Sequence, residues 1–316
     1  MIDVVALGEL LIDFTCQSVS DEGYPTMSAH PGGAPANFLS ALASCGAKTA
    51  FIGKVGNDSF GRTLTNTLNK AGIETKGLIM AEDVFTTLAF VTVDGTGNRE
   101  FSFARKPGAD TTLTFDEIDF SLIDEAKVFH FGTLSLTDEP ARTATVKAVE
   151  YAQKQGKLIT YDPNLRPPLW KSLEDARKQI LWGLTKADIV KISDNEIECL
   201  FGLSPEDGAS YIIENYDVKL VFVTCGADGC YFETATVKGH VSALENLKVV
   251  DTTGAGDIFG GFALWGVLEN NKKPEELQYE ELYSITRFAC VAAGLSTQKQ
   301  GGISSIPSMK EINQFY

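Results

Sequence analysis

Short apolar runs alternate with segments of helical spacing along most of the chain, and this alternation restricts the possible folds more than any other feature. The apolar runs are continuous, as in strands buried on both faces: residues 4–7, 49–52, 128–131, 158–161, 189–192 and 220–224. Helical patterns occupy intervals between them, and most end at a glycine: residues 36–45, 60–71, 140–155 and 174–186. Strands that alternate with helices predict an α/β fold with a doubly wound, mainly parallel central sheet flanked by helices.

One stretch departs from that rhythm and predicts a second, smaller unit. Residues 86–93 and 99–105 resemble two strands around the glycine-rich turn 94–98. We expect this hairpin to stand off the main sheet, and the irregular residues 13–31 to join it as a lid. A chain of 316 residues exceeds the roughly 100–200 of one usual domain. We nevertheless expect a single catalytic domain, residues 1–316, with a discontinuous β lid from about 13–31 and 84–106.

Charge and composition exclude several classes of protein. The chain has 27 basic and 42 acidic residues, a net charge of −15, and no Lys- or Arg-rich run, so we expect no binding to nucleic acid or to anionic membranes. Its 44% hydrophobic content excludes a disordered protein. Six scattered cysteines and three histidines indicate neither a disulfide framework nor a zinc site. The N-terminus is acidic and no apolar run approaches the ~18 residues of a membrane span, so we expect a cytoplasmic protein.

The strongest local signal is the sequence DTTGAGD at residues 251–257, which precedes apolar residues at helical spacing. Gly254 and Gly256 allow backbone N–H groups to approach an anion where that helix begins, and the helix dipole adds its positive end. The negative charge of an aspartate there would repel a phosphate. The residue is therefore unexpected at an anion site, unless its task is to take a proton from a nearby group. Asp257 is therefore a candidate general base, and the alternative is an ordinary first-turn aspartate that stabilises the helix.

Other motifs for nucleotides are absent from the sequence. There is no GxxxxGK[ST] element and no HRD and DFG pair, which excludes a P-loop enzyme and a protein kinase. Gly8, after the first apolar run, does not begin a GxGxxG element, which argues against a nicotinamide dehydrogenase.

A second glycine cluster, GGAPAN at residues 32–37, leads into an apolar helix and is followed by spaced glycines in residues 53–61. With DTTGAGD near the other end, it makes the chain resemble the ribokinase-like (PfkB) carbohydrate kinase family over essentially its full length. The resemblance implies transfer of the γ-phosphoryl group of ATP to a sugar hydroxyl, with the sugar between an α/β body and a β-stranded lid. It implies that Asp257 is the base and that Gly254, Ala255 and Gly256 supply the amides of an anion hole.

The resemblance also implies which residues bind the sugar. Asp13, Gly33 and Asn37 fall where the family contacts sugar hydroxyls, and short polar side chains suit such a ligand because each buried hydroxyl needs a partner. The lid carries an aromatic-x-Arg element, Phe103 and Arg105. For Arg105 the sequence leaves two roles open, a contact to the sugar and a salt bridge within the lid.

Arg166 lies in the sequence YDPNLR, which follows the strand expected at residues 158–161. Ligands of open α/β sheets bind at the ends of such strands, so we expect Arg166 to meet the transferred phosphate. A surface ion pair is the alternative.

The resemblance places the nucleotide and its magnesium ion on further elements. The family's Asn-x-x-Glu element, which binds magnesium through water, corresponds to Ser193 and Glu196, with serine in place of asparagine. Thr224, Gly226 and Gly229 correspond to the loop along the ADP, for which a plain strand-turn-strand is the alternative. The cofactors implied are therefore ATP and Mg²⁺.

Many ribokinase-like enzymes bind potassium beside the anion hole. The corresponding residues are Asp251 and Thr253, with carbonyl groups of residues 296–305. Residues 299–304 depart from the ribokinase pattern, while the resemblance implies that K⁺ raises activity.

The choice of sugar depends on the elements around Arg105 and Arg166. The sequences ALGELLIDF, RKPGAD and YDPNLRPPLW are most similar to those of bacterial and plant fructokinases, so fructose, phosphorylated at a primary hydroxyl, is the expected substrate. A 2-keto-3-deoxygluconate kinase is the rival, and a ribokinase or nucleoside kinase fits less well. A catalytically idle sugar or nucleotide sensor is the non-enzymatic alternative. The partners expected are ATP and a sugar, and a homodimer through the β lid is consistent with the family.

Overall fold

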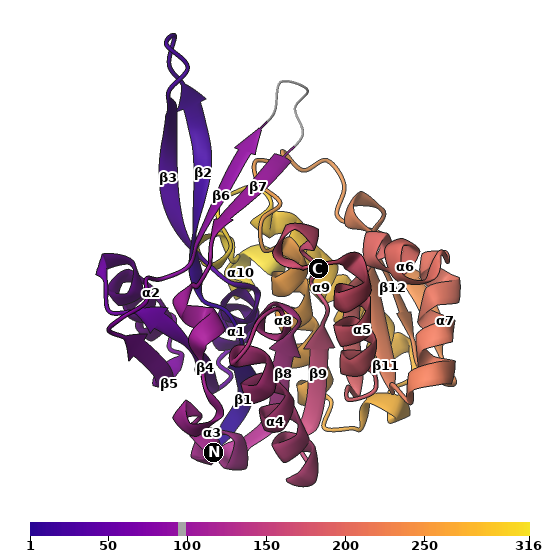
Figure 1. Cartoon of the computed structure of the whole chain (residues 1–316). Helices are drawn as coiled ribbons and strands as arrows, with labels where there is room; N and C mark the ends of the chain where they lie inside the picture. The colour runs from indigo at the N-terminus through magenta and orange to yellow at the C-terminus, as the bar shows by residue number, and fades with distance from the viewer. Residues whose placement is uncertain (94–98) are drawn as a thin grey trace.

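The protein is built on two sheets of different size, as the computed structural model shows for residues 1–93 and 99–316 (Figure 1). The larger sheet has nine strands in the described chain, in the order β13 (Lys238–Val241), β12 (Cys230–Glu233), β11 (Leu220–Thr224), β10 (Ile189–Ser193), β9 (Leu158–Asp162), β8 (Ala126–Gly132), β1 (Ile2–Leu7), β4 (Thr49–Gly56) and β5 (Glu74–Ala81). Seven of them are parallel and β12 and β13 are antiparallel. All six strands expected for this sheet are present, and the predicted fold class is confirmed.

Helices cover both faces of the larger sheet (Figure 1). One apolar core packs that sheet against α1 (Ala34–Ser44), α2 (Ser59–Lys70), α8 (Ala255–Glu269), α9 (Tyr279–Ser296) and α10 (Met309–Ile312). The core on the opposite face contains α3 (Phe120–Glu125), α4 (Ala141–Lys154), α5 (Leu173–Leu184), α6 (Asp194–Phe201) and α7 (Pro205–Tyr216). Both faces of the central strands are therefore buried, which explains why those strands are continuously apolar in sequence.

The smaller sheet stands off the larger one (Figure 1). Its order is β3 (Pro25–Gly32), β2 (Leu11–Val19), β6 (Leu88–Val93) and β7 (Arg99–Ala104). The predicted hairpin of β6 and β7 is confirmed by their antiparallel register, while its turn, residues 94–98, lies outside the described residues. The expectation that residues 13–31 are irregular is wrong, since β2 and β3 form a second antiparallel hairpin. Much of this hairpin is exposed and polar, so it lacks the apolar pattern that marks a buried strand.

Sequence patterns did not identify the strands β5, β12 and β13 at the edges of the larger sheet, or the helices α6 and α7 on one face and α9 on the other. Among residues 1–93 and 99–316, no helix combines the length and the hydropathy that crossing a membrane requires.

Candidate active site

Segments from distant parts of the sequence meet at the edge of the larger sheet where its parallel strands end. Asn37 lies in the first turn of α1, and its Nδ2 donates to Asp257 Oδ2 at 2.8 Å. Asn164 follows β9, and its Nδ2 lies 3.4 Å from Asp257 Oδ1. Open α/β sheets bind ligands outside this edge. The structure thus brings the two glycine clusters predicted from sequence together at Asp257.

Asp257 is partly buried in the first turn of α8. Burial raises the pKa of its carboxyl group, and the charge of Lys191, the Asn37 hydrogen bond and the charge of Arg166 oppose that rise. Asp257 also borders a cavity of about 30 Å³, a volume that suits a water molecule and is too small for a hexose. A carboxylate held by two amides and with raised proton affinity is suited to take a proton from a hydroxyl group.

The start of α8 is shaped by close backbone contacts. Gly254, its N-cap, has φ +76°, a left-handed conformation that favours glycine. A Cβ there would lie 2.9 Å from Gly302 Cα and 3.0 Å from Asn37 Nδ2. The first N–H groups of a helix have no acceptor within the helix. Gly254 and Gly256 therefore present such groups next to Asp257, in a space that a side chain would fill, while the Ala255 N–H donates to the Thr252 carbonyl oxygen at 3.3 Å.

Lys191, like Asn164, is a residue of this site that the sequence analysis did not predict. It lies in β10, and its Nζ contacts Asp162 Oδ2 at 3.0 Å. A Cβ on Gly256 would lie 2.9 Å from the same Nζ, which places the ammonium group beside the start of α8. Burial disfavours its charge, but Asp162, Glu196 and Asp257 together raise its pKa, so Lys191 stays cationic. The sequence feature that could have indicated this residue is the single lysine within the apolar run 189–192.

The predicted sugar-binding residues lie at the junction of the two sheets. Asp13 lies on β2, and a Cβ on Gly32 would collide with its carboxylate. Burial raises the pKa of Asp13 to about 7, with Arg166 opposing the rise and Asp257 adding to it. Gly33 is the N-cap of α1 with φ +119°, and a Cβ there would lie 2.5 Å from the Glu9 carbonyl oxygen. Asn37 is buried, and its Oδ1 has no partner within the described structure.

The raised pKa of Asp13 predicts a pH effect on stability. The carboxyl group is ionised above about pH 4 in the unfolded chain and above about 7 in the folded protein. Between these values the folded state binds one more proton, so the free energy of unfolding decreases as the pH rises. Urea unfolding of wild type and Asp13→Asn from pH 4.5 to 8 should therefore show the variant gaining stability relative to wild type. Parallel pH profiles of the two proteins would contradict this prediction.

Arg166 is half-buried beyond the end of β9. Its charge lowers the pKa of both Asp13 and Asp257, so its guanidinium lies within electrostatic reach of both carboxylates. Its Nη1 donates to the Leu165 carbonyl oxygen at 3.2 Å, and within the described residues Arg166 forms no salt bridge. Arg166 is therefore placed to accept an anion that arrives at this edge.

The predicted nucleotide elements follow the neighbouring strands β10 and β11. Ser193 caps α6, and Glu196 is buried and accepts hydrogen bonds from the N–H and hydroxyl of Ser193, both at 2.8 Å. Its other oxygen accepts from Leu165 N at 2.6 Å, which ties α6 to the loop that carries Arg166. Thr224 ends β11, and Gly226 and Gly229 bound the turn that follows.

Asp251 and Thr253 form a compact turn before α8. Asp251 is buried, and its Oδ1 accepts from the N–H and hydroxyl of Thr253 at 3.0 and 2.7 Å. Its Oδ2 accepts from Gly301 N at 3.0 Å, so the turn is joined to the loop after α9. Within the described chain, no three His, Cys, Asp or Glu side chains gather as a metal site.

The structure shows a salt bridge of Arg105, which is one of the two roles that the sequence left open. The side chain is only 2% exposed and forms an ion pair with Asp110, with 2.7 Å between Nη2 and Oδ2. Its other donors reach Thr137 and Leu134, so the guanidinium is occupied by protein groups. A contact to the sugar is therefore not what this geometry supports. Phe103 pairs with Ala89, which pairs with Asp13, so Phe103 and Asp13 share a row of the smaller sheet.

An α/β body whose helix opens with glycines beside an aspartate, with a small second sheet at the same edge, defines a small-molecule kinase of the ribokinase-like type. The sequence model of the pfkB family carbohydrate kinases matches residues 1–309, and the chain belongs to this family.

Similar proteins agree with this assignment. The chain is 42% identical over 311 residues to "Fructokinase-2" of Solanum lycopersicum, covering 98% of this chain and 94% of the relative. A fructokinase from Xylella fastidiosa, solved with bound ATP, superposes with a TM-score of 0.90 at 29% identity, covering 99% of this chain and 98% of the other. A double mutant of the Vibrio cholerae O395 fructokinase, solved with fructose, ADP and a potassium ion, gives a TM-score of 0.88 at 28% identity, covering 99% and 98%.

Proposed function

We propose that this carbohydrate kinase is a fructokinase, which transfers the γ-phosphoryl group of ATP to a primary hydroxyl of fructose. The observation that carries the proposal is the position of Asp257, which two amides hold next to the first backbone N–H groups of α8. A base and an anion-binding helix start side by side are what phosphoryl transfer to a hydroxyl requires. The curated relatives at about 42% identity over nearly the whole chain support fructose as the acceptor.

In the proposed reaction each group has one task. Asp257 takes the proton of the attacking hydroxyl, whose oxygen forms the bond to the γ-phosphorus as the bond to the ADP oxygen breaks. The amides of Gly254, Ala255 and Gly256 hold the negative charge on the transferred group, and Arg166 approaches it from the β9 side. Lys191 is the second cation at this position. Asp13, Gly33 and Asn37 orient the sugar, with Phe103 on the same face of the smaller sheet as Asp13.

The arrangement of charges favours a neutral sugar over a sugar acid. A ketodeoxygluconate carboxylate would need a cation from the lid, and Arg105 is the buried lid arginine. Its charge is already balanced by Asp110 inside the protein. The carboxyl groups of Asp13 and Asp257 also lie at the site, and in their ionised forms they would repel the carboxylate of a sugar acid. We therefore rank fructose above 2-keto-3-deoxygluconate.

The residues present fit a magnesium ion held with the nucleotide. Glu196 is a buried carboxylate in the first turn of α6, and the three groups that hydrogen-bond to it are all donors, so it can accept further hydrogen bonds from metal-bound water. Ser193 lies beside it in the capping box, and Thr224, Gly226 and Gly229 would lie along the ADP. When bound with ATP, magnesium neutralises charge on the β- and γ-phosphates.

A potassium ion fits less directly. Asp251 uses its oxygens to bind Thr253 and Gly301, and an ion would have to share these oxygens with carbonyl groups of the adjoining loop. We retain K⁺ activation as part of the proposal, supported by the potassium ion named with the Vibrio cholerae O395 fructokinase. Replacement of K⁺ by a bulky organic cation at matched ionic strength should lower kcat, and equal rates would refute the activation.

The smaller sheet is proposed as the lid of the single domain, residues 1–316. Its edge strands β3 and β7 leave backbone groups available for pairing with a second copy of the chain. This supports a homodimer through the smaller sheet, which light scattering can check.

The proposed location of the protein is the cytoplasm. All six cysteines are free thiols, and an ATP-consuming enzyme with free thiols suits that reducing compartment.

The proposal is tested by an ATP-dependent phosphorylation screen of fructose, ketodeoxygluconate, ribose, tagatose and adenosine. We expect the highest kcat/KM for fructose. A preference for ketodeoxygluconate of more than about tenfold, roughly 1.4 kcal/mol of transition-state stabilisation, would reverse the assignment.

A further inference from the structure

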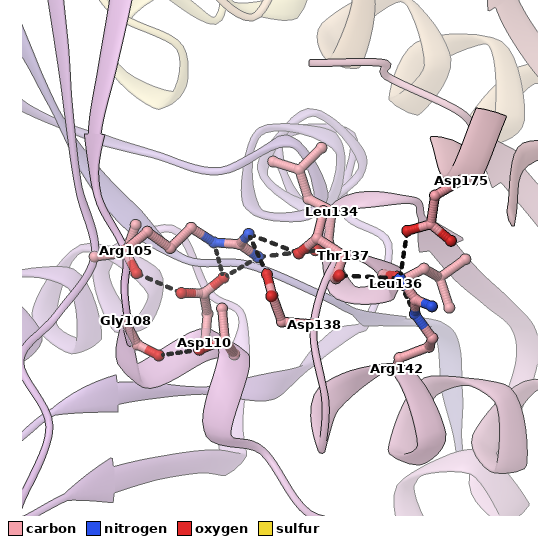
Figure 2. A network of polar contacts seen from close by, with 11 residues as sticks. Arg105, Gly108, Asp110, Leu134, Leu136, Thr137, Asp138, Arg142 and Asp175 are labelled. Carbon is pink, nitrogen blue, oxygen red and sulfur yellow. Dashed lines mark hydrogen bonds and ion pairs between the residues drawn. The ribbon is translucent and has the colours of Figure 1, made fainter. Parts of the chain in front are cut away.

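Arg105 joins the smaller sheet to the body through an unusually complete set of contacts. It directly follows β7, and its Nε and Nη2 lie 2.8 and 2.7 Å from Asp110 Oδ2. Its Nη1 donates to Thr137 Oγ1 at 2.7 Å, and Nη2 donates to the Leu134 carbonyl oxygen at 2.8 Å. Figure 2 shows the guanidinium with Asp110 on one side and Leu134 and Thr137 on the other. Asp110 and the turn of Leu134 and Thr137 belong to different segments of the chain, so the Arg105 side chain holds two segments together.

On the side of the smaller sheet, the contacts lead to Asp13. The Thr87 hydroxyl donates a short hydrogen bond to Asp110 Oδ1, and the Thr87 carbonyl oxygen accepts from Ile12 N at 3.1 Å. Ile12 pairs with Leu88, and the next residue of β2 is Asp13. Asp110 is thus connected by hydrogen bonds through Thr87 to the segment of β2 that carries Asp13, the proposed sugar-binding residue.

On the side of the body, the contacts lead to Asp257. Leu134 and Thr137 belong to the turn that follows β8, and Thr133 at its start donates a short hydrogen bond to the Pro163 carbonyl oxygen. The next residue, Asn164, lies 3.4 Å from Asp257 Oδ1. The same turn is fixed to the rest of the body, because Arg142 donates to the carbonyl oxygens of Leu136 and Thr137 (Figure 2).

We propose that Arg105 is a positioning residue that sets the separation between Asp13 on the smaller sheet and the Asn164 loop on the body, and thereby sets the affinity for the sugar. The inference rests on the proposed function of the same site. Arginine suits this task because its planar fork serves several acceptors at fixed angles, which the single ammonium of lysine does not. Asp110 balances the charge, and Asp138 Oδ2 lies 3.9 Å from Nη1, so the guanidinium is not left as an uncompensated buried charge.

Two variants of similar shape cut the bridge on opposite sides of Arg105. Thr87→Val removes the contact of the smaller sheet to Asp110, and Thr137→Val removes the contact of the body to Arg105 Nη1. Thr145→Val is the matched control, since Thr145 is fully buried in α4 and its hydroxyl has no partner in the described structure. Each network variant should raise the KM for the sugar about 2- to 10-fold, the range expected from one hydrogen bond. The KM for ATP and kcat should stay within about twofold, as in the control.

Arg105→Lys keeps the charge but loses the fork, so its sugar KM should increase more than that of either threonine variant. Hydrogen exchange of peptides from residues 9–16 needs no substrate, and exchange there should become faster in all three network variants but not in Thr145→Val. If fructose is not the sugar, the exchange result still stands and the kinetics are repeated with the sugar found in the screen. An unchanged sugar KM in the network variants, an equal rise in the KM for ATP, or unchanged exchange would overturn the proposal.

Discussion

Asp257→Asn should lower kcat by about 10²- to 10⁴-fold, the contribution typical of a general base, while fructose and ATP still bind. Asparagine keeps the shape and one acceptor for the Asn37 amide, which donates to Oδ2 at 2.8 Å, so the site should stay assembled. What is lost is the group that takes the proton. The measurement is kcat from a coupled ADP assay, together with calorimetric titration of each substrate.

Asp188→Asn is the matched control for that variant. Asp188 is also a partly buried carboxylate with a raised pKa caused by burial, but it precedes β10 at the opposite end of the strand and accepts from Ile159 N at 2.8 Å. It should change stability and leave kcat nearly unaltered. If Asp257→Asn kept more than about a tenth of wild-type kcat with chemistry rate-limiting, Asp257 would not be the base. Asp13 would then be the carboxylate to test.

Gly254→Ala should reduce kcat at least about 10²-fold, the loss typical of removing one anion-hole donor. The added Cβ would lie 2.9 Å from Gly302 Cα and 3.0 Å from Asn37 Nδ2, so the helix start or the Asn37 amide must move. Either movement displaces a proposed contact to the transferred phosphoryl group or to the base. The measurement is kcat and KM for both substrates.

Gly202→Ala separates this effect from backbone strain. Gly202 also has a left-handed conformation, φ +65°, at the end of α6, but a Cβ there meets nothing within 4 Å. Both alanine variants should lose about 1 kcal/mol of stability from the conformation alone. Only Gly254→Ala should lose activity, and equal activities in the two variants would show that the α8 start does not hold the phosphoryl group.

The sequence predicted those parts of the fold in which a regular pattern of burial leaves a regular pattern of apolar residues. The central strands are buried on both faces, so their apolar runs identified them, and the glycine after α1, α2 and α4 marked where these helices end. The hairpin of β2 and β3 was missed because its outer residues are exposed and its sequence is polar. The pairing of β2 with β6 connects segments about 75 residues apart, as the register of Asp13 and Ala89 shows. A local sequence pattern does not indicate such a contact.

The residues of the candidate site divide in the same way, into those in one local motif and those that depend on distant segments. Asp257 and the glycines around it form one continuous motif, which the sequence presents intact. Lys191 and Arg105 depend on partners from other segments, Asp162 for the first and Asp110, Leu134 and Thr137 for the second. Sequence alone could therefore raise the possibility that Arg105 forms a salt bridge, but only the folded chain shows how fully its donors are used.

The most direct test of the central claim is the stoichiometry of products made by the purified wild-type protein from fructose, ATP and Mg²⁺. We predict one phosphorylated hexose for each ADP, identified by ³¹P NMR as a primary phosphate ester, and no ADP above background without sugar. With Asp257→Asn, ADP should form about 10²- to 10⁴-fold more slowly. Binding of ATP and fructose without formation of the ester would contradict the account, because it would make the protein a sensor built on a kinase fold.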